Sequence, residues 1–435
     1  MSTYFHSVQL DEEKCRGCTN CVKCCPTEAI RVRHGKAIID NIRCIDCGEC
    51  IRACPNRAKS VHTDPKSMRD TFKYTIALPA PSLFAQFPGE VEPGKVLSAL
   101  KESGFSHVFE VAIAAEIAAE AIEEYVSGYT GQFPLISTSC PTVVRLIQVR
   151  FPEMIKHLIP IEAPMEIAAC ISREEVIRET GCFNDEIGAF FISPCPAKVT
   201  AVHQPVGLRK SCVDGVFSLA DIYADIYRAL PRVIEETPVR ASAKGLNWAR
   251  GGGESEGINI DEYLAVDGIE HVISVLEEIE MGKLKNLKFI ELQSCTEGCV
   301  GGVLTVENPF VAKVRLGRIV RKLAPEPKIK PVVSPDAYII SGELEARPIL
   351  KLDDDVNEAL CKMAELEKIV EILPGLDCAA CGAPHCRALA EDIVRGNAHL
   401  TDCVFVLRKR VKELVTEMMD LTERLPPVMG KREKE

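Results

Sequence analysis

Cysteine is the residue that most constrains this chain. Its 435 residues contain 21 cysteines, of which nine lie between Cys15 and Cys54 and four between Cys378 and Cys403. Met1–Glu13 lacks the basic and apolar regions of a secretory signal, and a reducing cytoplasm argues against a disulfide framework in so long a chain. Clustered thiols in that setting indicate metal chemistry. Five cysteines without partners at ligand spacing are interpreted as buried or incidental thiols: Cys24, Cys170, Cys182, Cys212 and Cys361.

The first cluster consists of two runs with one spacing. They are Cys15-x2-Cys18-x2-Cys21-x3-Cys25-Pro26 and Cys44-x2-Cys47-x2-Cys50-x3-Cys54-Pro55. This is the bacterial ferredoxin spacing, in which the fourth cysteine of each run ligates the other cluster. We therefore expect one 4Fe–4S cube on Cys15, Cys18, Cys21 and Cys54, and a second on Cys44, Cys47, Cys50 and Cys25. Zinc sites are the alternative, but structural zinc favours two separated cysteine pairs. Short strands at 29–32 and 36–39 fit between the runs.

The C-terminal cluster has a different spacing, Cys378-x2-Cys381-x4-Cys386-x16-Cys403. It resembles the small four-cysteine iron–sulfur module of membrane electron-transport complexes and corrinoid iron–sulfur proteins, which implies a third accessory 4Fe–4S cluster. A zinc site is the alternative. A helix is predicted over 387–395.

A long amphipathic helix is predicted after Cys403. Its apolar residues alternate at +3 and +4 and form a seam of three heptads: Val404, Leu407, Val411, Leu414, Met418, Leu421 and Leu425. The seam fits a homodimer through Val404–Leu425 that passes a signal. It fits equally well a helix that packs on its own cluster domain.

Between these ends the pattern is α/β. Apolar runs at 74–78, 108–111, 188–192 and 287–292 alternate with helical stretches at 94–103, 116–126, 220–230 and 269–281. Parallel sheets with crossover helices follow from this order, and sites in such sheets gather at the carboxyl ends of strands. Three apolar runs lead directly into Cys140, Cys195 and the Cys295/Cys299 pair. These four thiols are predicted to converge on one further cluster.

Composition excludes several other classes of protein. Hydrophobic residues make up 46% of the chain, which is enough for sizeable cores. The formal net charge of −11 makes a nucleic-acid binder or a protein that adsorbs to anionic membranes a poor interpretation. No apolar run approaches 18 residues, so no transmembrane helix is predicted. We expect a cytoplasmic protein.

The segments around the four central cysteines resemble the three signature motifs of the FeFe-hydrogenases. They are TSCP at 138–141, SPCPAK at 193–198 and the stretch from Gln293 to Gly302. The resemblance implies an H-cluster, which is a 4Fe–4S cube joined to a diiron unit with CO, cyanide and a dithiolate amine. It implies that Cys140, Cys195 and Cys295 ligate the cube and that Cys299 bridges to the diiron unit. It also implies that Lys198 donates a charge-assisted hydrogen bond to cyanide. Residues implied to line the diiron pocket are Ala80, Pro81, Ser82, Ser193, Pro194 and Gln293.

The departures from the family motifs concern the proton path and the polar residues around the cluster, among them Ser193 and Gln293. The family has two adjacent cysteines in its first motif, and Ser139 stands in the position that relays protons. A thiol has a pKa of about 8.5, whereas a serine hydroxyl does not ionise near neutrality. Glu116, Glu120, Glu123 and Glu124 lie on the early helix but receive no role. Altered polar residues, the C-terminal module and the terminal seam together resemble the sensory type of FeFe-hydrogenase.

The predicted fold is an α/β hydrogenase core of two lobes with parallel sheets. An α+β ferredoxin domain with two 4Fe–4S clusters precedes it, and a small helical iron–sulfur domain follows. The boundaries are 1–65, 70–345 and 360–425.

The predicted function is slow, reversible hydrogen oxidation and proton reduction at the H-cluster, in a hydrogen or redox sensor. Cys299, Lys198 and Ser139 are the catalytic candidates. Expected partners are H2, protons, a ferredoxin-like electron carrier and a signalling protein. The alternatives are a fast metabolic hydrogenase, and an iron–sulfur assembly or electron-transfer relative without a diiron site.

Overall fold

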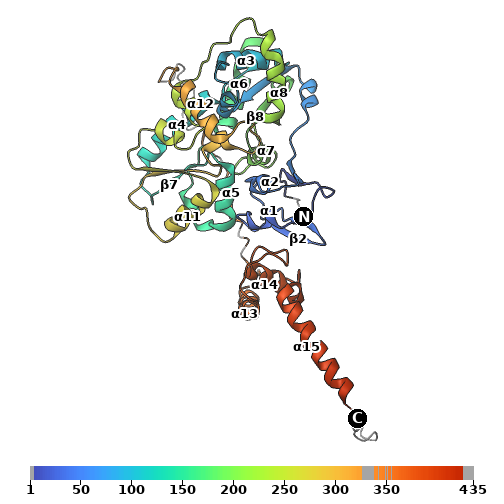
Figure 1. The fold of residues 1–435 in the computed structure, drawn as a ribbon. Helices are drawn as coiled ribbons and strands as arrows, with labels where there is room; N and C mark the ends of the chain where they lie inside the picture. The colour runs from blue at the N-terminus through green and yellow to red at the C-terminus, as the bar shows by residue number, and fades with distance from the viewer. Residues whose placement is uncertain are drawn as a thin grey trace.

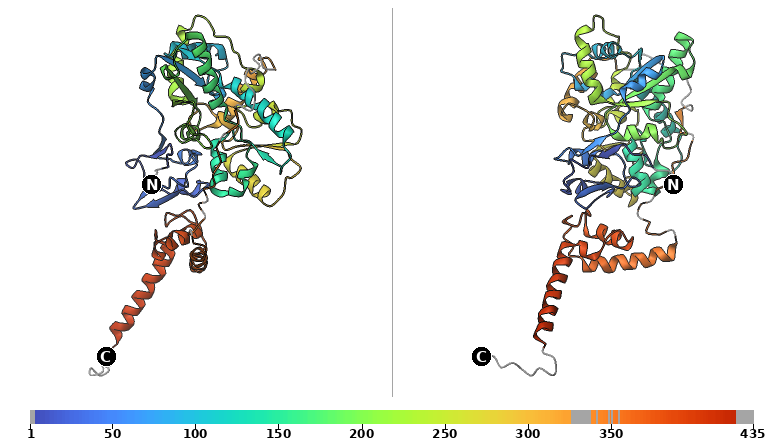
Figure 2. Two further views of the ribbon diagram at one scale, coloured as in Figure 1. Left: turned by 180° about the vertical axis from the view of Figure 1, so that it is seen from behind. Right: turned by 90° about the vertical axis from the view of Figure 1, so that its right-hand side faces the viewer.

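The computed structural model describes residues 4–325, 338–340, 342–347, 349, 351–353 and 355–424. Figure 1 shows a large α/β body, a smaller N-terminal part beside it in blue, and a C-terminal helical part in orange and red. The N-terminal part lies between the other two in the views of Figures 1 and 2. Within the described residues, no helix combines the length and apolar character needed to cross a membrane.

The N-terminal part is built from two similar halves. Strand β1 (Val8–Leu10) pairs antiparallel with β4 (Lys59–Val61), and β2 (Ile30–Arg33) pairs antiparallel with β3 (Lys36–Ile39). The second strand pair confirms the predicted one with a shift of one residue. Each cysteine run contains one turn of helix, α1 (Asn20–Lys23) or α2 (Glu49–Arg52). This is the predicted α+β ferredoxin-like arrangement.

The large body contains two parallel sheets. One has the order β6 (His107–Val108), β5 (Tyr74–Pro79), β8 (Ile187–Ser193), β9 (Gly215–Ser218). The other has the order β10 (Tyr263–Asp267), β11 (Phe289–Gln293), β7 (Leu135–Ile136). Strand β8 is buried along its whole length, as expected of a parallel strand covered on both faces. The predicted core of two lobes is therefore present.

Helices cover both sheets. They are α3 (Pro93–Glu102), α4 (Val111–Gly128), α5 (Pro141–Arg150), α6 (Pro164–Thr180), α7 (Pro196–His203), α8 (Leu219–Ala229), α9 (Ala243–Asn247), α10 (Gly253–Gly257), α11 (Ile269–Glu280) and α12 (Pro309–Val320). The strand predicted at 108–111 is wrong beyond Val108, because Val111 already begins α4. An alanine-rich stretch with high helix propensity follows it, so the helix starts five residues earlier than predicted.

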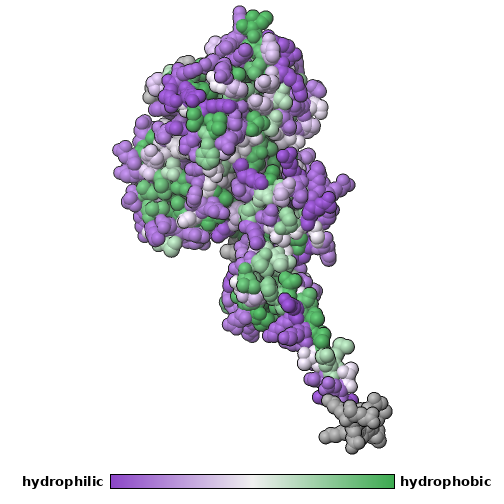
Figure 3. All heavy atoms as spheres, viewed as in Figure 1, coloured by the Kyte–Doolittle hydropathy of each residue, from purple (hydrophilic) through white to green (hydrophobic). Residues whose placement is uncertain are grey.

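The C-terminal part contains α13 (Val356–Ile372), α14 (Cys386–Val394) and α15 (Val404–Glu423). Helices α13 and α14 share a small core with the last cysteines. Helix α15 projects away from the rest of the chain in both figures and buries none of its residues. Its apolar seam is exposed to solvent, from 43% at Leu407 to 66% at Met418, and Figure 3 shows apolar side chains at this surface. Packing of the seam on the chain's own cluster domain is therefore wrong for the described residues. Leu425 lies outside them.

A disulfide corrects one expectation about the central cysteines. Cys170 on α6 is bonded to Cys212, which lies just before β9. The prediction that both are thiols without partners is therefore wrong. They are 42 residues apart in the sequence, and only the packing of α6 against the four-stranded sheet brings them together. Cys24, Cys182 and Cys361 are free thiols.

Candidate metal centre

Four cysteines from three motifs face one cavity between the two lobes. Cys140, Cys195, Cys295 and Cys299 all line it. Cys140 follows β7, Cys195 follows β8 and Cys295 follows β11, so the carboxyl ends of strands from both sheets contribute. The predicted convergence is therefore observed.

Local sequence explains how two of these thiols are held. Cys140 and Cys195 are the N-cap residues of α5 and α7, and in each case a proline occupies the first helical position. Proline is pre-organised for that position, so it fixes where the helix begins. The two prolines therefore hold Cys140 and Cys195 at defined positions at the edge of the cavity.

The third motif brings the backbone very close to its neighbours. Gly298 has a φ of +81°, and a Cβ there would lie 2.3 Å from Gln293 Oε1 and 2.5 Å from Gly251 N. Only glycine fits both the conformation and the space. Its presence lets the short 3₁₀ turn Gly298–Gly301 place Cys299 in the cavity.

Lys198 brings a positive charge to the same cavity. Its Nζ lies 3.9 Å from Cys299 Sγ. No carboxylate of the described residues lies within ion-pair distance of it. Burial opposes its charge, but Cys299, Cys195, Cys140 and Cys295 raise the pKa of Lys198 above its usual value. Because Lys198 has no carboxylate partner, its charge suits the binding of an anionic group in this cavity. Four thiols beside a half-buried cation are a set of groups that fits an H-cluster.

Ser139 contacts a buried acid that the sequence did not reveal. Ser139 Oγ donates to Glu254 Oε1 at 3.2 Å, and Ser137 Oγ donates to the same oxygen at 2.6 Å. Glu254 lines the cavity and is 1% exposed. Burial raises the pKa of Glu254 well above its usual value, and the charge of Glu291 raises it further. Glu254 directly follows the glycines at 251–253, near the start of α10.

Glu291 on β11 stands behind Glu254. It is 1% exposed and accepts hydrogen bonds from Gly252 N at 3.0 Å, Ser255 N at 2.8 Å and Gln293 Nε2 at 2.9 Å. Burial raises the pKa of Glu291 as well. Two adjacent buried carboxyl groups cannot both ionise cheaply, so at least one holds a proton near neutral pH.

The other predicted residues divide into two groups. Ala80, Pro81, Pro194, Gln293, Ser139 and Lys198 line the cavity. Ser82 and Ser193 are buried outside the lining, and Ser193 Oγ instead donates to Cys195 O at 2.8 Å. The acids of α4 do not line the cavity either. Glu116 accepts from Ser242 N, Glu123 bonds Asn259, and Glu120 and Glu124 are exposed.

The N-terminal cysteines form the two predicted sets. Cys15, Cys18, Cys21 and Cys54 line one small cavity, and Cys25, Cys44, Cys47 and Cys50 line another. Backbone N–H groups point at the sulfur atoms, from Ala29 to Cys25 and from Ala58 to Cys54, each at 3.2 Å. Hydrogen bonds to sulfur are one means by which proteins tune iron–sulfur clusters. Cys24 lines neither cavity.

The second of these cavities adjoins the central one. Arg52 on α2 donates to Gly301 O, in the third motif. A Cβ on Gly48 would lie 2.8 Å from Val303 Cγ1. The loop that carries Cys47 and Cys50 therefore packs directly on the loop that carries Cys299.

The C-terminal cysteines lie around the small core shared by α13 and α14. Cys381, Cys386 and Cys403 belong to it, and Cys378 is exposed. Burial raises the pKa of Cys381, and the charges of Cys378 and Cys403 raise it further.

Comparison with known proteins identifies the family. The family model described as iron only hydrogenase large subunit, C-terminal domain, matches residues 73–229 and 212–303. A 4Fe–4S dicluster domain model matches residues 7–66, and an Fe–S cluster model matches residues 373–405. The chain belongs to the iron-only hydrogenase large-subunit family.

The similar proteins are distant. The periplasmic Fe hydrogenase large subunit of Nitratidesulfovibrio vulgaris is 29% identical over 213 residues, which cover 44% of this chain and 50% of that protein. Iron hydrogenase 1 of Clostridium pasteurianum is 26% identical over 372 residues, covering 68% of this chain and 64% of that one. A solved FeFe-hydrogenase from Chlamydomonas reinhardtii aligns with a TM-score of 0.49 at 14% identity, over 66% of this chain and 97% of that one. The chain thus spans half the length of the first relative.

Proposed function

We propose that this protein is a low-turnover FeFe-hydrogenase that interconverts H2 with two protons and two electrons and serves as a hydrogen or redox sensor. The observation that carries this proposal is the central cavity, where four cysteines, one enclosed cation and one buried acid meet. An iron–sulfur assembly factor or an electron-transfer adapter needs the cysteines but has no use for the cation or the acid.

In this proposal the sixteen clustered cysteines hold four iron–sulfur cubes. Three are accessory clusters, and the fourth is the cube of the H-cluster on Cys140, Cys195, Cys295 and Cys299. The division into parts at 1–65, 70–345 and 360–425 follows from the positions of these clusters. Electrons enter or leave through the N-terminal and C-terminal clusters, with a ferredoxin-like carrier and a signalling protein as partners.

The protein's own residues provide binding, charge and a proton. When bound, the diiron unit supplies the metal chemistry that splits or forms hydrogen. Lys198 holds an anionic ligand of that unit through a charge-assisted hydrogen bond. Glu254 holds a proton at the edge of the cavity, and Ser139, next to Cys140 in the chain, donates a hydrogen bond to this acid. Because a serine hydroxyl is a poor acid, this path makes turnover slow and favours sensing over bulk metabolism.

The direct test is hydrogen evolution by protein loaded with a synthetic diiron cofactor, with a reduced dye as electron donor. We expect measurable but slow evolution that disappears when Cys299 is changed to alanine. Loaded protein that evolves no hydrogen, with all cubes intact, supports the adapter alternative instead.

Lys198→Met tests how the cofactor is retained. Methionine keeps most of the length of lysine but removes the cation. A hydrogen bond to a charged group contributes about 1.5–3 kcal/mol, so we expect retention of the diiron unit to weaken by roughly 10- to 150-fold. Iron and infrared band intensity that remain after gel filtration measure this. Lys101→Met, on the exposed surface of α3, is the charge-matched control. Equal retention by both variants contradicts the assigned role.

Leu414→Glu tests the proposed homodimer through α15. The exposed seam of this helix is suited to a second copy of itself. Burying Leu414 in both copies contributes about 3–6 kcal/mol, so the glutamate should weaken the dimer by roughly a hundredfold or more. Analytical ultracentrifugation at micromolar concentration measures the state. Lys412→Glu, off the seam, should leave the dimer intact. A monomeric wild-type protein overturns this part of the proposal.

A further inference from the structure

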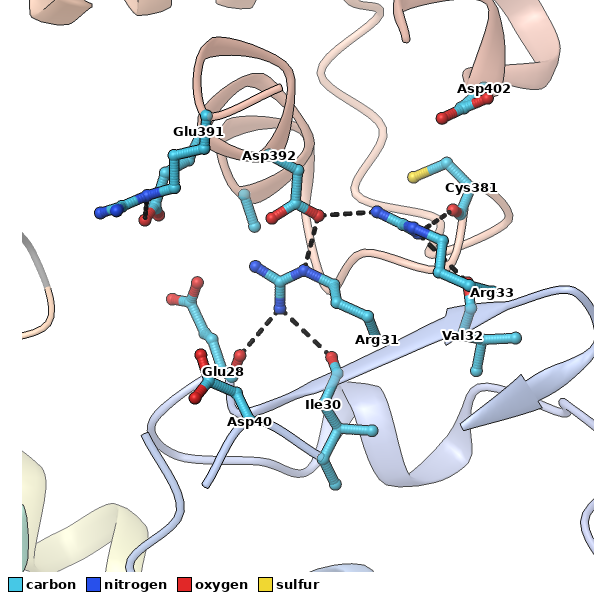
Figure 4. Close-up of polar contacts among 12 residues, drawn as sticks. Glu28, Ile30, Arg31, Val32, Arg33, Asp40, Cys381, Glu391, Asp392 and Asp402 are labelled. Carbon is cyan, nitrogen blue, oxygen red and sulfur yellow. Dashed lines mark hydrogen bonds and ion pairs between the residues drawn. The ribbon is translucent and has the colours of Figure 1, made fainter. Parts of the chain in front are cut away.

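The C-terminal part is attached to the N-terminal part by backbone contact at a cysteine loop. Val32 N donates to Gly382 O at 2.9 Å, and Arg33 Nη1 donates to Cys381 O at 2.9 Å. Figure 4 shows Arg33 reaching from the hairpin to the loop of Cys381. The loop between two of the predicted C-terminal ligands therefore lies directly on strand β2.

Gly382 makes this close approach feasible. Its φ is +81°, and a Cβ there would lie only 2.0 Å from Val32 O. Any other residue would push the loop off the strand. Gly375 in the same part has a similar φ of +66° but nothing within 4 Å of an added Cβ. Gly382 therefore needs to be glycine for two reasons: its backbone conformation, and the contact with Val32 of the N-terminal part, which leaves no room for a side chain.

Ion pairs fix the same contact. Asp392 on α14 binds Arg31 Nε and Arg33 Nη2, each at 2.7 Å. Its neighbour Glu391 binds Arg43. Figure 4 shows Asp392 pointing down from α14 between the two arginines of β2. Asp392 is only 8% exposed, so removing its charge leaves partly buried cations without a partner, which is costly. Shielded pairs of this kind fix orientation better than exposed ones do.

The contact lies over one particular N-terminal cavity. Val32, which bonds Gly382, also lines the cavity of Cys15, Cys18, Cys21 and Cys54. The other cavity is lined by Ile30 and Ile39 among others, and its loop packs on the central cavity through Arg52 and Gly301. The C-terminal part also reaches residues beside this cavity, through the pairs of His385 with Glu28 at 2.9 Å and of Glu391 with Arg43. Val32, a lining residue of the first site, bonds the C-terminal cysteine loop directly, whereas the loop of the second site packs on the central cavity.

We propose that the C-terminal cluster exchanges electrons with the cluster held by Cys15, Cys18, Cys21 and Cys54, across the contact of Gly382 with Val32. The hydrogen site is then the inner end of one line of clusters and the C-terminal part is its outer end. In each step one electron leaves a reduced cluster and an oxidised neighbour accepts it, with no bond or proton changed. This inference rests on the proposed cluster assignments but not on the presence of a diiron unit or on hydrogen turnover.

The test is electron paramagnetic resonance of the full chain, loaded with cubes only and reduced with dithionite. In the wild type we expect the C-terminal cluster signal to be split and fast-relaxing, because it couples to a neighbouring cluster. Cys18→Ser should remove that coupling and Cys47→Ser should not, since they disrupt different N-terminal clusters. Coupling that depends on Cys47 instead, or an uncoupled C-terminal signal in the wild type, overturns the proposal.

Asp392→Lys should detach the C-terminal part, because it places a third cation between Arg31 and Arg33. We expect the C-terminal signal to lose its splitting while the iron content stays unchanged. Glu367→Lys, which alters the exposed pair with Arg387 on the same part, is the control. If Asp392→Lys does not fold, Gly382→Ala against Gly375→Ala makes the same comparison. Low iron in the wild type would instead contradict the cluster assignments, so the two failures are distinguishable.

Discussion

Glu254→Gln should lower hydrogen turnover of the cofactor-loaded protein by about 10²–10⁴-fold, the usual effect of losing one positioned acid–base group. Glutamine keeps the shape of the side chain and accepts from Ser137 and Ser139 as the carboxyl does. It cannot release a proton. The loss should therefore appear in the rate, while iron content and cofactor retention stay unchanged.

Glu116→Gln is the matched control for this substitution. Glu116 is also a buried acid of the large body, but it accepts a hydrogen bond from Ser242 N and does not line the cavity. Its replacement should leave turnover within a few-fold of wild type. Equal rates for Glu254→Gln and wild type would show that protons reach the cavity by another route.

The protonation of Glu254 can be followed by infrared spectroscopy. Because burial and Glu291 raise the pKa of Glu254 above its usual 4.5, the carboxyl should stay protonated as pH rises past the range where exposed acids ionise. A protonated carboxyl band at neutral pH that is missing from Glu254→Gln is the expected result.

Ser139→Cys should raise turnover by one or more orders of magnitude. The residue lines the cavity and already bonds Glu254, so a thiol there receives protons from the same acid. The ordinary pKa of a thiol, about 8.5, is far closer to neutrality than that of a serine hydroxyl. Dye-linked hydrogen evolution, normalised to bound cofactor, measures the gain.

The two substitutions should not be additive. If the new thiol is supplied by Glu254, the gain from Ser139→Cys should largely vanish in a Glu254→Gln background, since neighbours that share one path are energetically coupled. A gain of the same size in both backgrounds would mean that the introduced thiol acts with some other proton donor, and no change at all would place the bottleneck elsewhere.

Much of this architecture was predictable because the informative residues are local. The ferredoxin spacing specifies its ligands within eleven residues, and three strand-to-cysteine segments placed Cys140, Cys195 and Cys295 at the carboxyl ends of strands. Buried strands such as β8 were found from short apolar runs, with boundaries within a residue or two.

What the sequence did not reveal depends on contacts between distant segments. Ser139 and Glu254 are 115 positions apart and meet only when α10 packs beside β11. Cys170 and Cys212 meet by the packing of α6. The docking of Gly382 on Val32 joins residues from opposite ends of the chain. An amphipathic seam such as that of α15 predicts a packing partner without identifying it. In the structure the seam is exposed, so its own cluster domain is not that partner.

The most direct test of the central claim is the infrared spectrum of the protein loaded with a synthetic diiron cofactor, recorded in the CO and cyanide stretching region with and without hydrogen. We predict bound-cofactor bands that shift when hydrogen is added, as the proposed H-cluster in the cavity of Cys140, Cys195, Cys295, Cys299 and Lys198 requires. Intact cubes with no bound-cofactor bands would contradict that claim and identify the chain as an electron-transfer or assembly-type relative.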